Sequence, residues 1–148
     1  MMKFYHFIKN AIFSLLAKQT VGVRMLLINE GRILLVKHTY RSGWYTIGGA
    51  VDPGETPSEA MERELKEEVG ATLTSKPKLF SIYYSRNEKR DDYIIFYVNQ
   101  GCIQEKVISS EIAEQRWFPL DQLPDELSPA TLRRIQEYLG EREIDERW

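Results

Sequence analysis

The sequence predicts an α/β/α sandwich in which helices cover a mixed β-sheet. Several runs rich in apolar, β-branched and aromatic residues, separated by turn residues, indicate strands. A helix with strong capping signals lies in the middle of the chain, and a second one lies near its end. The 148 residues fit one domain that can bury about two-thirds of the surface of its unfolded chain.

The first eighteen residues, MMKFYHFIKNAIFSLLAK, have apolar side chains at helical spacing and three interspersed lysines. We expect an amphipathic helix over residues 1–18 that packs on the domain or on a homodimer partner. A basic amphipathic helix can also lie on an anionic membrane surface. A signal peptide fits less well, because Lys9 and Asn10 interrupt the apolar region and no convincing small-residue cleavage site follows.

Strand patterns begin after residue 19. An apolar run reaches Ile28, the residues Asn29-Glu30-Gly31-Arg32 form a turn, and a second run returns to Val36, which predicts a hairpin. Two later runs are separated by a polar turn and are expected to pair as another hairpin. The expected strands are 20–28, 33–36, a short extended segment at 45–47, a segment around Leu73, 79–84 and 93–98.

The stretch 49–71, GAVDPGETPSEAMERELKEEVGA, contains the central helix. Thr56 is a good N-cap, Pro57 suits the first helical position, and Glu59 completes a capping box. Gly70 supplies a left-handed stop. The helix should therefore begin and end within this stretch, after a loop that holds Gly48 and Gly49. Its apolar stripe is expected to consist of Met61, Leu65 and Val69.

The last part of the chain contains a polar connection over 111–115 and a final helix. Ser128 caps this helix, Pro129 occupies its first position, and Gly140 ends it. Its buried face is expected to consist of Leu132, Ile135 and Leu139. The charged residues 141–148 are expected to fray. The domain proper should span residues 19–140.

Three glutamates of the central helix, Glu64, Glu67 and Glu68, share one face at i, i+3 and i+4 spacing. Glu55 precedes the helix and can point toward the same place. A solvated acidic face would explain such a cluster at a cost of a few tenths of a kcal/mol. A site for a hard cation also explains it, because Mg²⁺ and Mn²⁺ prefer carboxylate oxygens.

These residues closely resemble the Nudix box, the signature of a hydrolase family. Gly49, five residues, Glu55 and seven residues lead to Arg63-Glu64-Leu65-x-Glu67-Glu68-x-Gly70, which matches every fixed position. The closing hydrophobic residue is the small Ala71. The flanking segments 43–44 and 117–124 resemble those of many small Nudix hydrolases. Many relatives have a proline where this chain has Ile47, so the approach to the glycine pair is expected to be less rigid here.

The resemblance implies a metal-dependent hydrolase that cleaves a phosphoanhydride bond in a nucleoside diphosphate derivative or a nucleoside triphosphate, with Mg²⁺ or Mn²⁺ as cofactor. By this resemblance the metal ligands are the box glutamates Glu64, Glu67 and Glu68, with the carbonyl of Gly48 and with Glu55 as further candidates. The alternative is a Nudix-fold module that binds nucleotides without catalysis. Such a module would be expected to lose metal-site glutamates, and here all are present.

The remaining catalytic and substrate-binding residues are less clearly marked. Arg63 is expected to orient a glutamate through a bidentate pair, and a general base could be Glu111 or Glu114. Candidates for phosphate contacts are His38, Arg41 and Arg86; candidates for stacking on a base are Tyr40, Trp44, Tyr83 and Tyr84. Each of these residues also has an ordinary structural explanation.

The substrate is only partly narrowed by the sequence. Nudix relatives that act on ADP-ribose often carry a proline about fifteen residues after the box, and this chain has Ser85-Arg86-Asn87 there. Non-canonical nucleoside triphosphates and nucleotide sugars both remain open. A net charge of −2 gives no electrostatic reason to expect nucleic-acid binding.

Composition favours a reducing compartment. The single cysteine, Cys102, cannot form an internal disulfide, so we expect a cytoplasmic protein. No apolar run in the sequence is long enough to span a bilayer.

Overall fold

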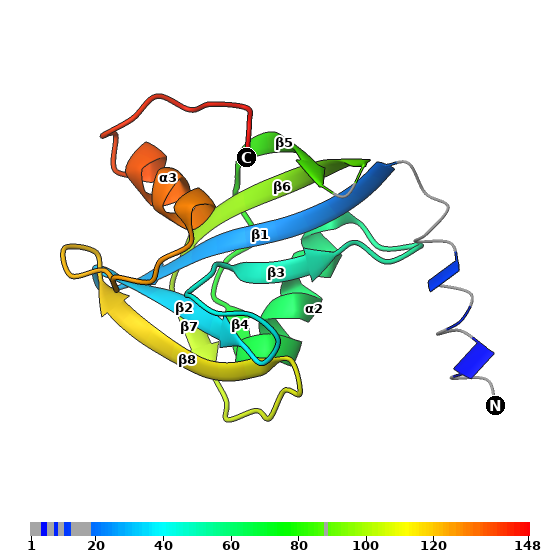
Figure 1. Ribbon diagram of the computed structural model, residues 1–148. Helices are drawn as coiled ribbons and strands as arrows, with labels where there is room; N and C mark the ends of the chain where they lie inside the picture. Colours follow the sequence, from blue (N-terminus) through cyan, green and yellow to red (C-terminus); the bar gives the residue numbers. More distant parts are fainter. Residues whose placement is uncertain (1–3, 6–7, 9–10, 13–18, 88) are drawn as a thin grey trace.

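The computed structural model describes residues 4–5, 8, 11–12, 19–87 and 89–148 (Figure 1). The expected amphipathic helix, dimer contact and membrane contact rest on residues 1–18, most of which lie outside the described residues. In the described part of the chain, no helix is long and apolar enough to cross a membrane. The elements are β1 (Gln19–Asn29), β2 (Arg32–His38), β3 (Ile47–Ala50), α2 (Pro57–Val69), β4 (Ala71–Leu73), β5 (Leu79–Asn87), β6 (Arg90–Gln100), β7 (Cys102–Gln104), β8 (Ile112–Pro119) and α3 (Pro129–Tyr138).

The main sheet is mixed, as expected. Its strand order is β5-β6-β1-β2-β8. Strand β3 also pairs with β1, over residues 22–25, whereas β2 pairs with the end of β1 at Ile28 and Asn29. β1 and β6 are parallel, whereas the remaining pairs are antiparallel. Both expected hairpins, β1–β2 and β5–β6, are confirmed. The first turns through Glu30 and Gly31, both with positive φ. Strands β4 and β7 form a separate small sheet.

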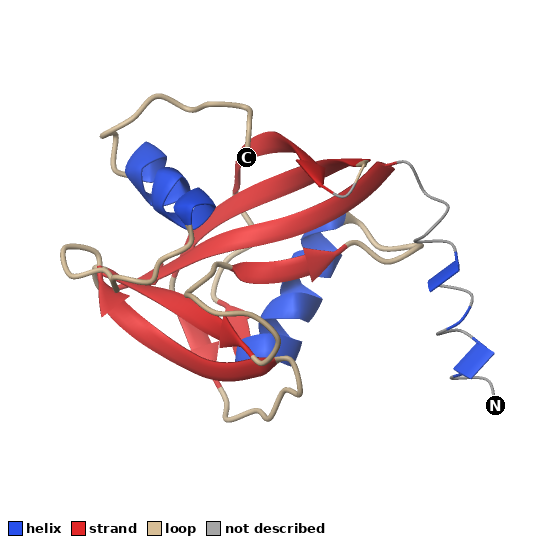
Figure 2. Cartoon of the chain, viewed as in Figure 1, coloured by secondary structure: helices blue, strands red, loops and turns tan. Residues whose placement is uncertain are grey.

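Helices α2 and α3 lie on opposite faces of the main sheet (Figure 2). Side chains alternate along a strand, so one strand can serve two cores. In β1, Met25 and Leu27 pack against α2, whereas Leu26 and Ile28 belong to the core beneath α3. The α/β/α sandwich is therefore confirmed, and β1 is its central strand.

Helix α2 begins and ends where its local sequence predicts. The hydroxyl of Thr56 accepts a hydrogen bond from the Glu59 N–H at 3.2 Å. Gly70 adopts a left-handed conformation (φ 66°), and its N–H donates to the Lys66 carbonyl at 3.1 Å. The apolar stripe Met61, Leu65 and Val69 is fully buried against the sheet. This burial fixes which face of the helix remains for the glutamates.

Helix α3 is capped as expected by Ser128, but its buried face was wrongly predicted. Ile135 is buried, whereas Leu132 and Leu139 remain about 40% exposed (39% and 42%). The side chains of Arg134 and Glu137 are fully buried in their place as an ion pair. Polar groups outside the helix, such as the Asp145 N–H and the Tyr83 hydroxyl, form hydrogen bonds with Glu137 of this pair. The periodicity of the helix sequence gives no information about these partners.

Residues 141–148 do not fray, which corrects the expectation. The N–H of Tyr84 in β5 donates to the Glu146 carbonyl at 2.7 Å, and the Trp148 N–H donates to the Tyr84 carbonyl at 2.9 Å. Figure 1 shows this segment running back from α3 to the edge of the sheet. Its charged side chains face solvent, while its backbone extends β5 by a parallel bridge between Arg147 and Tyr84.

Two further local predictions are corrected. Gly48 and Gly49 lie in strand β3, paired with Arg24 and Val23 of β1, and not in a loop. Glu114 lies in β8, opposite Lys37 of β2, and not in a polar connection. Because β8 is an edge strand, it tolerates charged side chains that a central strand would exclude.

Candidate active site

Arg63 is the centre of an ion-pair network at the start of the acidic face of α2. Its Nε and Nη2 atoms contact both oxygens of Glu55, at 2.7 and 3.0 Å, in a bidentate pair. Its Nη1 atom contacts Glu64 at 2.9 Å and Glu67 at 3.3 Å. The hydrogen bonds with Arg63 lower the pKa of Glu55, and those with Glu55 raise the pKa of Arg63. The expected role of Arg63 in orienting glutamates therefore has a direct geometric counterpart.

Glu68 lies deeper than the other box glutamates. Its side chain is 5% exposed, and its Oε2 atom has no hydrogen-bond partner among the described residues. Burial, and next the negative charge of Glu64, raise the pKa of Glu68 to about 8. A buried carboxylate oxygen without a partner is costly. A cation beside it would remove that cost, so the donor set fits a hard divalent ion.

The glycine pair allows β3 to approach these carboxylates closely. A Cβ atom on Gly49 would lie 2.4 Å from the Oε1 atom of Glu64. A Cβ atom on Gly48 would lie 1.9 Å from the Val23 carbonyl oxygen. The Gly48 carbonyl accepts a hydrogen bond from Nη1 of Arg24 at 2.9 Å. The backbone of β3 thus forms one wall beside the glutamates.

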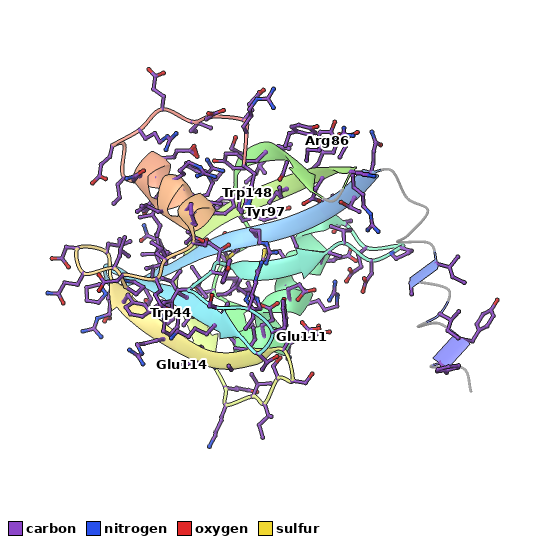
Figure 3. The ribbon with its side chains drawn as sticks, in the orientation of Figure 1. Trp44, Arg86, Tyr97, Glu111, Glu114 and Trp148 are labelled. Carbon is purple, nitrogen blue, oxygen red and sulfur yellow. The ribbon has the colours of Figure 1, made fainter. Side chains whose placement is uncertain are left out.

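A cleft of about 550 Å³ opens beside this acidic face. One side comes from α2 and the other from the connection between β7 and β8. Figure 3 shows Glu111 close to α2 and Glu114 further along β8. Glu111 lines the cleft, whereas Glu114 does not and instead pairs with Arg116. We call this space the carboxylate cleft; it is lined by Arg63, Glu64, Glu67, Glu68 and residues 107–111.

In their present conformations the acidic side chains do not surround a single point. Within the described ranges, no group of three or more His, Cys, Asp or Glu side chains has the spacing to hold an ion. Arg63 contacts Glu55, Glu64 and Glu67 and so occupies the space between them.

A second cleft, of about 580 Å³, lies on the α3 face of the sheet. We call this space, on the α3 side of β3, the nucleoside cleft. Gly49 lines it and also adjoins Glu64, so β3 separates the two clefts. Its lining residues are Thr20, Val21, Gly22, Arg24, Arg41, Tyr45, Thr46, Gly49, Ala50, Ser85, Asp92, Ile94, Ser128, Pro129, Ala130, Thr131, Arg133 and Trp148.

Arg41 is held in the nucleoside cleft by its neighbours. Its guanidinium lies 3.7 Å from the ring centroid of Tyr45, and its Nε atom donates to Nδ1 of His38 at 3.2 Å. Burial, followed by the charge of Arg41, lowers the pKa of His38 to about 4. His38 is thus a neutral acceptor that positions Arg41, and it is itself 6% exposed.

Comparison of the sequence and the structure with known proteins identifies the family of this chain. The model of the NUDIX domain matches residues 18–139. The chain belongs to the Nudix family. A candidate 8-oxo-dGTP diphosphatase of Bacillus subtilis (strain 168) is 32% identical over 120 residues, which cover 80% of this chain and 79% of that protein. The nucleoside triphosphatase NudI of Escherichia coli O17:K52:H18 is 29% identical over 136 residues, covering 80% and 96%.

Solved structures agree with this assignment. The MutT Nudix hydrolase of Burkholderia pseudomallei superposes with a TM-score of 0.71 at 27% identity, covering 80% of this chain and 96% of that one. The protein is therefore a Nudix hydrolase. Its reaction class is the hydrolysis of a phosphoanhydride bond, in a family that generally needs a divalent cation.

Several residues expected to bind substrate lie elsewhere in this Nudix hydrolase. Trp44 is 4% exposed and packs edge-to-face on Phe118, and Tyr83 is 1% exposed with its hydroxyl donating to Glu137 at 2.8 Å. Neither ring is free to stack on a base. Their pattern of aromatic residues near a strand end reflects core packing on the α3 face.

The other candidates, Tyr40, Tyr84 and Arg86, lie outside both clefts. Tyr40 is 66% exposed and leans on His38 and Arg41. Arg86 and Tyr84 both contact Asp91, near the turn of the β5–β6 hairpin. Of the predicted substrate contacts, Arg41 alone lines the nucleoside cleft.

Sequence reasoning missed two residues that line the nucleoside cleft, Arg24 and Trp148. Arg24 interrupts the apolar alternation of β1 with a charge, which is a recognisable signal for a functional position in a central strand. Burial lowers the pKa of Arg24, while the nearby charge of Glu68 opposes that effect. Trp148 gave no such signal, because it lies in a segment that was expected to fray.

Proposed function

We propose that the carboxylate cleft binds Mg²⁺ or Mn²⁺ and that the nucleoside cleft holds the rest of the substrate. One observation carries this proposal: three glutamates of α2 and Glu111 line a single cleft, and the buried Oε2 atom of Glu68 lacks a partner. Three residues, Glu64, Glu67 and Glu68, would hold the cation. The Gly48 carbonyl is a further candidate ligand, although it already accepts a hydrogen bond from Arg24.

A divalent cation in this cleft would neutralise phosphate charge and make an attacking water more acidic. The residues of the chain have separate tasks. Arg63 is paired to Glu55 and so is fixed where it can orient Glu64. This pairing leaves Glu55 as a positioning residue, or an outer ligand, more than a direct one. β3 keeps the reacting phosphates beside the glutamates because glycine offers no side chain in between.

We assign the general base to Glu111 in preference to Glu114. Glu111 is exposed and lies across the carboxylate cleft from α2, where it could accept a proton from water. The carboxylate of Glu114 is engaged by Arg116 on the outer strand β8. An acceptor that is tied to an arginine outside the cleft is poorly placed for this role.

Among possible substrates we favour nucleoside triphosphates. The relatives described above are named for 8-oxo-dGTP and for nucleoside triphosphates. In the nucleoside cleft, Arg24 and Arg41 supply positive charge close to β3, which suits a chain of phosphates. A cleft of about 580 Å³ lies within the usual range for a small-molecule site.

The purified protein should be assayed with Mg²⁺ and with Mn²⁺ on a panel that contains dGTP, 8-oxo-dGTP, other nucleoside triphosphates, nucleotide sugars and ADP-ribose. We expect the highest kcat/KM for a nucleoside triphosphate, since specificity is expressed in that ratio. A nucleotide sugar or ADP-ribose as the best substrate would contradict the substrate class. Tight binding without cleavage of any compound would instead support a non-catalytic module.

The same assay separates the two candidate bases. Glu111→Gln should lower kcat about 10²-fold or more, the usual contribution of a general base. Glu114→Gln is the matched control and should leave kcat within about twofold. Equal effects of the two substitutions would remove Glu111 from this role.

A further inference from the structure

The residues after α3 form a segment that covers part of the sheet. Residues 141–148, which we call the strap, follow the helix and pair with Tyr84 of β5 through two backbone hydrogen bonds. Figure 2 shows the strap as the loop that returns from α3 to the neighbourhood of β5. It lies beyond residues 18–139, which the family model matches.

A buried charged pair holds the strap in one position. Nε of Arg134 lies 2.7 Å from Oε1 of Glu137, and both side chains are fully buried. Glu137 also accepts from the Asp145 N–H at 3.1 Å, and the Arg134 guanidinium reaches the Arg147 carbonyl at 3.5 Å. A buried ion pair is costly unless its remaining donors and acceptors are satisfied. The strap supplies two of these partners, and the Tyr83 hydroxyl of β5 supplies a further donor to Glu137.

Aromatic contacts fix the last residue of the strap. The Arg134 guanidinium lies 4.0 Å from the ring centroid of Tyr83 and 5.2 Å from that of Trp148. The Trp148 ring also packs against Tyr83 and Phe96, with centroids 5.6 and 5.8 Å apart. The indole thus rests on the buried rings of Tyr83 in β5 and Phe96 in β6.

Trp148 is not wholly covered by these contacts. It remains partly exposed and lines the nucleoside cleft together with Ile94 of β6 and Pro129 at the start of α3. β6 lies two strands away from β3 across the sheet, a separation of about 10 Å. The cleft therefore has two arginines, Arg24 and Arg41, toward β3, whereas its β5–β6 side combines the Trp148 indole and Ile94 with the polar Ser85 and Asp92.

We propose that the strap is a specificity element and that Trp148 forms the wall on which the nucleobase of the substrate packs. This inference rests on the proposed function, because it takes the phosphates to lie at the β3 end. A flat heteroaromatic base matches the exposed indole surface, while phosphates match the arginines. Removing an aromatic stacking partner costs about ten- to a hundredfold in affinity.

Binding should be measured as the quenching of tryptophan fluorescence by dGTP and 8-oxo-dGTP, with Ca²⁺ in place of Mg²⁺ to slow cleavage. We expect wild-type protein to be quenched and Trp148→Phe to lose most of this signal, although Trp44 and Trp117 remain. Quenching of equal size in both proteins, or no quenching of wild type by either nucleotide, would overturn the proposal. This measurement needs no cleavage, so it is independent of whether the hydrolytic assignment holds.

Kinetics with the best substrate of the panel add a second test. Trp148→Ala should raise KM about tenfold or more with kcat within about threefold, and Trp148→Phe should restore most of KM. Ile144→Ala is the matched control, because Ile144 belongs to the strap but does not line the nucleoside cleft. Thermal unfolding identifies a Trp148→Ala protein that fails to fold, in which case the comparison with Trp148→Phe decides. An unchanged KM in a folded Trp148→Ala protein, or an equal rise in Ile144→Ala, would overturn the proposal.

Discussion

Gly48 and Gly49 are neighbours in β3, yet a side chain at each would meet a different obstacle. At Gly48 the obstacle is the backbone of β1, with the Val23 carbonyl at 1.9 Å from an added Cβ. At Gly49 it is the tip of the Glu64 side chain, at 2.4 Å. Backbone in a central strand cannot move cheaply, whereas a carboxylate can rotate. The two glycines therefore serve the fold and the site, respectively.

This difference gives a prediction for alanine substitutions. Gly49→Ala should fold with near-wild-type stability but lose about 10²-fold in kcat/KM, because it displaces Glu64 by an ångström or more. Gly48→Ala should lose about 3 kcal/mol in the free energy of unfolding through the clash with β1. Urea denaturation and steady-state kinetics on both variants provide the test. A stable and fully active Gly49→Ala protein would show that activity does not require the β3 backbone to lie so close to the Glu64 carboxylate.

The residues around Arg63 show how far single positions could be assigned in advance. The bidentate pair with Glu55 follows from the chemistry of the two groups and their places in the box. The substrate contacts do not follow in this way. Whether Trp44 or Tyr83 faces solvent depends on the other face of a strand and on residues more than fifty positions away, such as Glu137. Local sequence carries no record of these partners.

Helix α2 and helix α3 differ in what determines their orientation. The caps and the apolar stripe of α2 lie within its own sequence, so its ends and its buried face could be predicted. In α3 the caps are again local, but the buried face includes the pair Arg134 and Glu137. These charges become acceptable in the core only when the strap folds back on them. Helical periodicity assigns charged residues to the solvent-exposed face. It therefore predicted Ile135 correctly but wrongly predicted that Leu132 and Leu139 are buried.

A substitution in α3 tests this dependence on the strap. Arg134→Met should lower the free energy of unfolding by about 3–5 kcal/mol, because it leaves Glu137 charged and buried without its partner. Arg133→Met changes the neighbouring, partly exposed arginine and should alter stability by less than about 1 kcal/mol. Chemical denaturation measures both. Similar stabilities for the two variants would mean that the buried pair does not hold the strap.

In the whole molecule, the central strand β1 connects the two clefts. Its partner β3 lines the nucleoside cleft through Gly49 and Ala50, and Gly49 also adjoins Glu64, which lines the carboxylate cleft. The sandwich could be predicted from the pattern of strands and capped helices, and the metal-binding face from the box. The nucleoside cleft could not be predicted from the sequence, because it forms where β1, β3, β6, α3 and the strap meet. These segments are far apart in the sequence and come together only in the folded chain.

Neutralising the glutamates of the carboxylate cleft tests most directly whether this cleft binds the cation. Glu67→Gln and Glu68→Gln keep the size of each side chain but remove its charge. Glu62→Gln is the matched control, since Glu62 lies in the same helix, is exposed and does not line the cleft. All three proteins should remain folded, because Glu62 and Glu67 are exposed and the burial of Glu68 favours its neutral form.

The measurement is kcat/KM with Mg²⁺ for the best nucleoside triphosphate of the panel, alongside thermal unfolding. We predict a loss of about a hundredfold or more for both Glu67→Gln and Glu68→Gln, as expected when a metal site is damaged, and no change for Glu62→Gln. Near-wild-type rates in both cleft variants would contradict the assignment of this site.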